Sequence, residues 1–149
     1  MNWKIFNTFF LLTFIFGCQT YSESDKETFD SKIKSYLSQK GIACSKSNSG
    51  LHYKIINPGE GAFIKYQDSL QFTYKASLLN GKTVDEQKEQ VQFAVKDLIA
   101  AWKEIVLELK PGAEVFMIAP PQLAYGEYKL DSIPENSILQ FEMKILGVK

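Results

Sequence analysis

The stretch SLQFTYKASLLNG, residues 69–81, decides the fold of this chain. Apolar and polar side chains alternate from residue 69 to residue 79, which predicts a strand with one buried face. Phe72 and Tyr74 lie on that face, and Thr73 and Lys75 lie on the other. The dipeptide Asn80-Gly81 then favours a tight hairpin turn. The sequence therefore predicts that the chain returns beside this strand in the antiparallel direction.

Further strands are predicted on both sides of this hairpin, at residues 51–56, 91–95, 114–119 and 137–148. One short helix is predicted between them, with Asp97 as its cap and Lys110-Pro111-Gly112 at its end. Its apolar face would carry Leu98, Trp102, Ile105 and Leu109. These elements predict an α+β fold in which an antiparallel β-sheet wraps around one short helix.

The N-terminus carries a targeting pattern. Lys4 precedes an apolar run from Ile5 to Phe16, which is too short to cross a bilayer and is typical of a secretory signal peptide over residues 1–17. The following Gly17-Cys18 resembles a bacterial lipobox, which predicts lipidation of Cys18 and attachment to the membrane of a bacterial cell envelope, on the periplasmic side or at the outer membrane. Ordinary secretion with a free Cys18 is the alternative.

Residues 18–49 are predicted to form a tether between this anchor and a domain over residues 50–149. Within the tether, an amphipathic helix is expected from Asp25 to Lys40, with a capping box at Ser24 and Glu27 and a stop at Gly41. Its narrow apolar stripe fits either loose docking on the domain or a spacer. The polar residues 44–50 are expected to be a linker.

Composition excludes several classes of function. The 17 acidic residues balance 17 lysines, and the chain has no arginine, which argues against a nucleic-acid partner. A single histidine, His52, excludes a histidine-rich metal site, and we expect it at the surface rather than as a catalytic base. If Cys18 is lipidated, Cys44 has no partner and no disulfide framework exists; if Cys18 is not lipidated, the two cysteines could pair. No metal and no cofactor is predicted.

Aromatic residues recur through the last hundred positions, at Tyr74, Trp102, Tyr125 and Phe141, accompanied by Asp85. No nucleophile, metal cluster or phosphate loop goes with them. Such a set would make an apolar cleft with one carboxylate, and rotation about a prolyl peptide bond is a reaction that needs little more. Alternatively, the aromatic residues are simply part of a hydrophobic core.

At these positions residues 50–149 resemble an FKBP-type peptidyl-prolyl cis-trans isomerase, in the form found in bacterial lipoproteins. The motifs that carry the resemblance are Ser49-Gly50-Leu51-His52-Tyr53, Tyr74-Lys75-Ala76, Asn80-Gly81-Lys82, Asp85, Ile99-Ala100-Ala101-Trp102, the segment Pro120 to Gly126, and the segment Ile133 to Phe141.

The resemblance implies an isomerase that helps exported or envelope proteins to fold. Trp102 would form the floor under the proline ring, Tyr125 would offer its hydroxyl to a substrate carbonyl, and Asp85 would polarise the site. The implied catalytic residues are Tyr74, Asp85, Ile99, Trp102, Tyr125 and Phe141, and the implied substrate-binding residues are Val84, Val91, Leu98 and Ile133. The implied partners are proline-containing polypeptides, macrolides of the rapamycin type, and a membrane reached through Cys18.

Several positions depart from the pattern of that family. Val84 stands where the family usually has phenylalanine, Val91 replaces a second aromatic residue, and the loop 127–132 is charged rather than rich in glycine. These departures leave two alternatives open: a degenerate FKBP-like binding or chaperone module, and a structural envelope lipoprotein without significant turnover.

Overall fold

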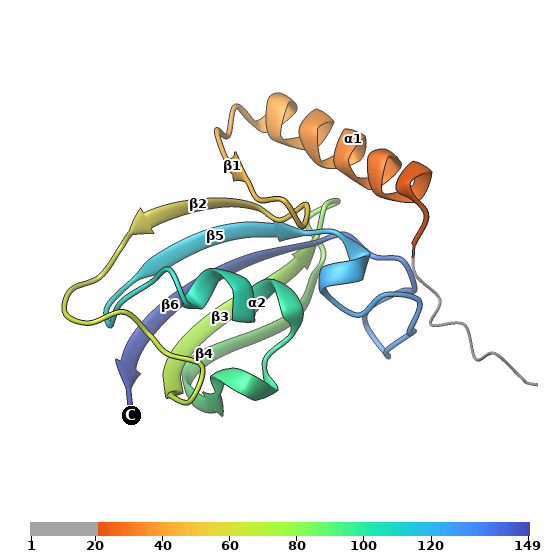
Figure 1. The fold of residues 1–149 in the computed structure, drawn as a ribbon. Helices are drawn as coiled ribbons and strands as arrows, with labels where there is room; N and C mark the ends of the chain where they lie inside the picture. The colour runs from red at the N-terminus through yellow and green to blue at the C-terminus, as the bar shows by residue number, and fades with distance from the viewer. Residues whose placement is uncertain (1–20) are drawn as a thin grey trace, which may run out of the picture.

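The computed structural model describes residues 21–149, so the predicted signal peptide and Cys18 lie outside the described residues. The chain forms two α-helices, six strands and two 3₁₀ turns (Figure 1). In chain order they are α1 (Glu23–Lys40), β1 (Ser45–Lys46), β2 (His52–Asn57), β3 (Ser69–Leu78), β4 (Thr83–Ala94), η1 (Val95–Asp97), α2 (Ala100–Val106), β5 (Glu114–Ala119), η2 (Pro121–Leu123) and β6 (Leu139–Val148).

The strands form one antiparallel sheet in the order β1-β2-β5-β6-β3-β4. The sheet curves around α2, and α1 lies over its other face (Figure 1). The predicted α+β plan, with a sheet wrapped around one short helix and an N-terminal helix in addition, is therefore confirmed. The hairpin at Asn80-Gly81 is also present, with Gly81 in the left-handed region at φ 88°.

The central strand β5 is buried on both faces because a helix covers each one. Val115, Met117 and Ala119 belong to the core around α2, whereas Phe116 and Ile118 pack toward α1. On β6 the alternation predicted from sequence is confirmed: Leu139, Phe141, Met143 and Ile145 are all buried. The two helices therefore face two separate hydrophobic clusters across one sheet.

The helix α1 begins two residues earlier than predicted. Its capping box is formed by Ser22 and Asp25 rather than by Ser24 and Glu27, and Gly41 ends it in the left-handed conformation, as expected. Ile33 and Leu37 are buried against Phe116 and its neighbours, so the spacer alternative is wrong. No helix between residues 21 and 149 is long and apolar enough to cross a bilayer.

His52 is buried, not exposed as predicted, with 4% of its surface accessible. Its Nε2 lies 2.8 Å from Oδ1 of Asp30 on α1, and Lys34 and Lys46 pair with the same carboxylate. The prediction failed because the partner of His52, Asp30 on the covering helix α1, lies 22 positions away in the chain. An isolated strand gives no signal of a polar partner at that distance.

Two local predictions were also wrong. Ser45 and Lys46 form the edge strand β1, so the expected linker contributes to the sheet. Asp97 ends the 3₁₀ turn η1 instead of capping the following helix, which begins after Ile99 without a side-chain cap. Here packing of Val95 and Leu98 into the core outweighs the local capping preference.

Candidate active site

One row of the sheet brings three distant segments together. Ala76 on β3 pairs with Phe141 on β6 and, on its other side, with Asp85 on β4. Side chains two residues apart on a strand share a face, so Tyr74 projects on the same side as this row. The small side chain of Ala76 leaves room between its two neighbours, and the row faces α2.

Trp102 on α2 meets this face of the sheet. Its ring contacts three aromatic rings edge-on, with centroid separations of 4.8 Å to Tyr74, 5.3 Å to Phe141 and 5.5 Å to Phe72. Such T-shaped contacts are favourable beyond the area that they bury. Trp102 is 8% exposed, and its Nε1 atom is buried without a partner among the described residues. The predicted floor and two of its predicted walls are thus in direct contact.

A carboxylate lies at the edge of this aromatic cluster. The hydroxyl of Tyr74 donates a hydrogen bond of 2.5 Å to Oδ2 of Asp85. Burial of the ring, and then the hydrogen bond and negative charge of Asp85, raise the pKa of Tyr74 well above its ordinary value. Tyr74 therefore stays a neutral donor across the physiological range.

Tyr125 reaches the site from the segment after β5. The 3₁₀ turn η2 is closed by the N–H of Ala124, which donates to the carbonyl of Pro121 over 3.0 Å, and the N–H of Gly126 donates to the same carbonyl over 2.9 Å. Tyr125 packs against the core, and burial, followed by the charge of Asp85, raises the pKa of its hydroxyl. It also lines a groove of about 1080 Å³ between this segment and the start of α1.

The remaining predicted residues surround the cluster at different depths. Ile99 is partly buried as the N-cap of α2, and its carbonyl accepts from Lys103 over 3.0 Å. Leu98 and Ile133 are almost fully buried in the same core, with 6% and 4% exposed. Val84 and Val91 on β4 are partly buried against it. All ten residues therefore belong to, or border, one region of the fold.

Sequence reasoning missed two features of this region. The ring of Phe72 contacts the ring of Trp102 edge-on. This contact could have been predicted, because Phe72 lies on the same face of its strand as Tyr74. The loop 127–132 is tied to β4, because the hydroxyl of Ser132 donates to the carbonyl of Val84 over 2.9 Å. No sequence pattern predicts a hydrogen bond between positions 48 residues apart.

The arrangement offers an apolar aromatic surface, one carboxylate and two neutral phenols. A curved antiparallel sheet that packs this set against a single short helix is the architecture of FKBP-like domains. The sequence model described as FKBP-type peptidyl-prolyl cis-trans isomerase matches residues 60–146, and the chain belongs to this family.

Relatives support the same assignment. The FKBP-type isomerase FkpA of Buchnera aphidicola from Schizaphis graminum is 35% identical over 136 residues, which covers 87% of this chain and 53% of that protein. FkpA of Escherichia coli strain K12 is 32% identical over 140 residues, covering 89% of this chain and 51% of that protein. The crystal structure of FkpA from Escherichia coli matches with a TM-score of 0.73 at 31% identity, over 85% of this chain and 62% of that one. The chain spans about half the length of the curated relatives that it matches.

Proposed function

We propose that this protein is a peptidyl-prolyl cis-trans isomerase that acts on proline-containing polypeptides through the aromatic cluster around Trp102. The observation that carries the proposal is the contact of Trp102 with Tyr74 and Phe141 beside Asp85, in a chain of the FKBP-type family. The relatives described above are named as peptidyl-prolyl cis-trans isomerases, which supports the same activity.

The chemistry needs no proton transfer. Rotation about a peptide bond has a barrier of about 18–20 kcal/mol because twisting removes the amide resonance. The twisted amide is less polar than the planar one, so an apolar and water-poor surface favours it relative to the ground state. We assign Trp102 as the floor under the proline ring, with Tyr74, Phe141 and Ile99 as walls.

Polar groups would hold the substrate backbone. The Tyr125 hydroxyl would donate to a substrate carbonyl, and the backbone N–H of Ile99 would be a second donor. Asp85 would polarise the site while it holds Tyr74 in place. Val84, Val91, Leu98 and Ile133 would complete the apolar lining, and macrolides of the rapamycin type would compete for the same surface.

A binding module without useful turnover is the second candidate, and two observations favour it. Val84 and Val91 are smaller than the aromatic residues usual in the family. Trp102 is only 8% exposed, so little of its ring is open to a ligand. The same low exposure is compatible with a purely structural lipoprotein.

A protease-coupled assay on the mature chain, with a short peptide that carries an apolar residue before proline, separates these candidates. Catalysed isomerisation that a rapamycin-type macrolide inhibits supports the enzyme. Saturable binding of the peptide without acceleration supports the binding module. If the peptide neither binds nor isomerises faster, only the structural candidate remains.

We further propose that Cys18 is lipidated and holds the protein at a bacterial cell envelope, where it assists the folding of exported proteins. The apolar run that ends in Gly17-Cys18 supports this. Cells that express the protein should incorporate labelled palmitate into it, and Cys18→Ser should abolish the label. A label that persists in Cys18→Ser excludes this attachment site.

A further inference from the structure

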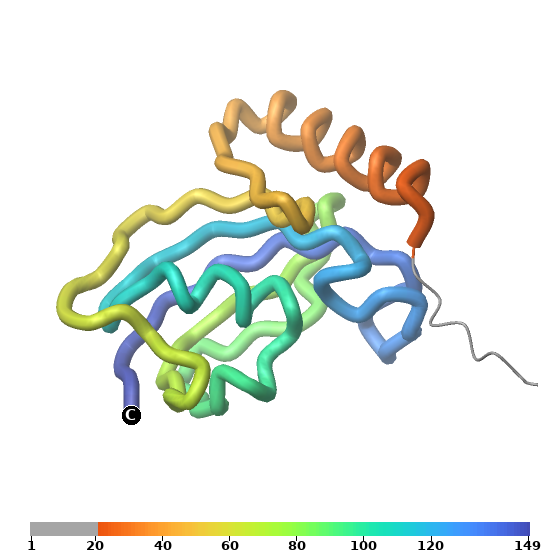
Figure 2. The backbone as a smooth tube through the Cα atoms, viewed as in Figure 1, coloured from red at the N-terminus to blue at the C-terminus, as the bar shows by residue number. Residues whose placement is uncertain are grey.

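The first described residue is fixed to the segment that carries Tyr125. The hydroxyl of Tyr21 donates to Oδ1 of Asn136 over 2.6 Å, and its ring meets Phe29 edge-on at 5.5 Å. The backbone N–H of Asn136 in turn donates to the carbonyl of Gly126 over 2.8 Å. The start of α1 and this segment lie side by side in Figure 2. Tyr21 is therefore held beside the segment that carries Tyr125.

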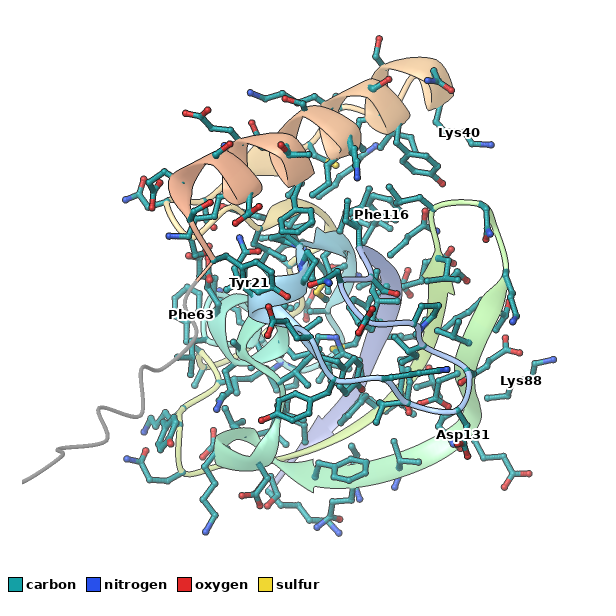
Figure 3. The ribbon with its side chains drawn as sticks, turned by 90° about the vertical axis from the view of Figure 1, so that its right-hand side faces the viewer. Tyr21, Lys40, Phe63, Lys88, Phe116 and Asp131 are labelled. Carbon is teal, nitrogen blue, oxygen red and sulfur yellow. The ribbon has the colours of Figure 1, made fainter. Side chains whose placement is uncertain are left out.

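The same place carries two exposed apolar side chains. Tyr128 is 78% exposed and Leu130 is 43% exposed, and both line the groove that Tyr21 and Tyr125 also line. Lys26 and Lys129 belong to the same groove. We call the surface made by Tyr21, Lys26, Tyr128, Lys129 and Leu130 the anchor face. Tyr21 lies on the side of the domain that is turned toward the viewer in Figure 3.

Covalent reach connects this surface to the predicted lipid. Cys18 is three residues from Tyr21, and three extended residues span at most about 10 Å. A lipid on Cys18 would thus enter a bilayer within that distance of Tyr21. While Tyr21 stays bonded to Asn136, these three residues are too short for the opposite end of the domain to face the membrane.

We propose that the anchor face rests on the lipid bilayer surface, so that the Tyr125 side of the site opens toward the membrane. This inference rests on the lipidation proposed above. Tyrosine is suited to such a surface because its ring is apolar and its hydroxyl is polar, and lysine can extend its ammonium group to the water. The substrates would be polypeptides that emerge at, or lie along, the membrane surface.

Charge does not drive this contact. Glu127 lies in the same groove as Lys26 and Lys129, and Asp131 follows Leu130, so acidic and basic groups are mixed. The covalent lipid and the apolar side chains are the parts that favour the bilayer. Vesicles of zwitterionic phosphatidylcholine are therefore the appropriate probe, since they remove attraction to anionic lipids as an explanation.

The experiment places an environment-sensitive dye at position 129 of the mature lipoprotein, as Lys129→Cys in a Cys44→Ser background. This keeps Tyr128 and Leu130 intact. The matched control is Glu60→Cys, in the turn after β2 at the opposite end of the sheet (Figure 1). Both proteins are bound to phosphatidylcholine vesicles that contain nitroxide-labelled lipid, and quenching of the dye is measured.

We expect at least severalfold stronger quenching at position 129 than at position 60. Adding Asn136→Ala should reduce the difference, because Tyr21 loses its partner on the loop. If quenching at position 129 of vesicle-bound protein is absent, or equals the quenching at position 60, the anchor-face proposal is wrong. The lipidation proposal is unaffected by that result. If the dye signal changes with protein concentration and not with the amount of nitroxide lipid, the surface contacts a second copy of the protein. That result also overturns the anchor-face proposal. Protein that lacks lipid and does not bind vesicles overturns both proposals.

Discussion

Tyr74 and Asp85 lie on neighbouring strands whose pairing is irregular, and the irregularity brings them within hydrogen-bond distance. Between the pairs Phe72–Val91 and Tyr74–Gln87, β4 advances four residues while β3 advances two. Pairing then continues regularly in this shifted register, which puts Asp85 opposite Ala76. The result is the 2.5 Å bond from the Tyr74 hydroxyl to Oδ2 of Asp85 at the edge of the aromatic cluster. A bulged strand thus positions the one carboxylate of the proposed site.

Trp102→Leu tests the proposed floor. The mature chain has Trp102 as its only tryptophan, since Trp3 lies in the predicted signal peptide. In the native protein, a proline-containing peptide should shift or quench the Trp102 emission saturably. The substitution should lower the isomerisation rate about tenfold or more, because it removes an aromatic contact surface. It should cost about 1–3 kcal/mol of stability and keep the fold, since leucine retains part of the packing.

The free energy of unfolding in urea, measured for the same Trp102→Leu protein, shows whether a lower isomerisation rate comes from the altered site or from an unfolded domain. An unchanged rate in Trp102→Leu, together with no emission change in the native protein, contradicts the proposed site. An emission change without turnover instead favours the binding module.

The isomerisation rate should depend little on pH between about pH 6 and 8. Tyr74 and Tyr125 both have a raised pKa, chiefly through burial and secondly through Asp85, so both phenols stay protonated in this range. Asp85 polarises the site in the proposed mechanism but transfers no proton. The measurement is kcat/KM at several pH values, repeated in His52→Ala to remove the only histidine. A bell-shaped profile in both proteins contradicts a mechanism without proton transfer.

Val84→Phe should strengthen the site. The substitution enlarges an apolar side chain that already packs against the core, and the Ser132 hydroxyl bonds only the Val84 backbone, so the loop stays tied. We expect the rate, or the affinity for a rapamycin-type macrolide, to rise by about ten- to a hundredfold. Val84→Leu is the control that adds apolar volume without a ring. A rate that falls in Val84→Phe while the protein remains folded shows that position 84 does not face the ligand.

Acid should weaken the attachment of α1 to the sheet. Burial alone would raise the pKa of Asp30, but hydrogen bonds from Lys34, Lys46 and His52 outweigh it and hold that pKa well below the ordinary value. A carboxyl group whose pKa is lowered in the folded state contributes its full stabilisation of that state above its unfolded-state pKa of about 3.9. The contribution is lost progressively as the pH falls from there toward the folded-state pKa. The protection of the α1 amides against hydrogen exchange, measured relative to the intrinsic exchange rate at each pH, should therefore fall below about pH 4.

Asp30→Asn should remove this dependence on pH and cost about 1–3 kcal/mol, because the carboxylate is the common partner of three cationic or donor groups. Lys34→Met is the matched control. Its side chain is largely exposed, so the loss should stay below about 1 kcal/mol. Equal effects of the two substitutions would show that Asp30 contributes no more than a surface ion pair.

The sequence alone determined the elements whose pattern is local. The alternation around Phe72 and Phe141 defined two strands and their buried faces, and Asn80-Gly81 defined the hairpin between β3 and β4. The order of the aromatic motifs was also sufficient to suggest the family, because those motifs are read along the chain and need no coordinates.

Only the tertiary structure decided which distant residues meet. His52 is buried because α1 folds back over β2 and supplies Asp30, and Tyr21 is held because Asn136 lies 115 positions further along the chain beside it. The register shift that joins Tyr74 to Asp85 is likewise a property of two paired strands. Such contacts depend on how elements pack, and side-chain periodicity within one element carries no information about its partner. Sequence therefore specified the parts of the proposed site, and packing of the sheet around α2 placed them together.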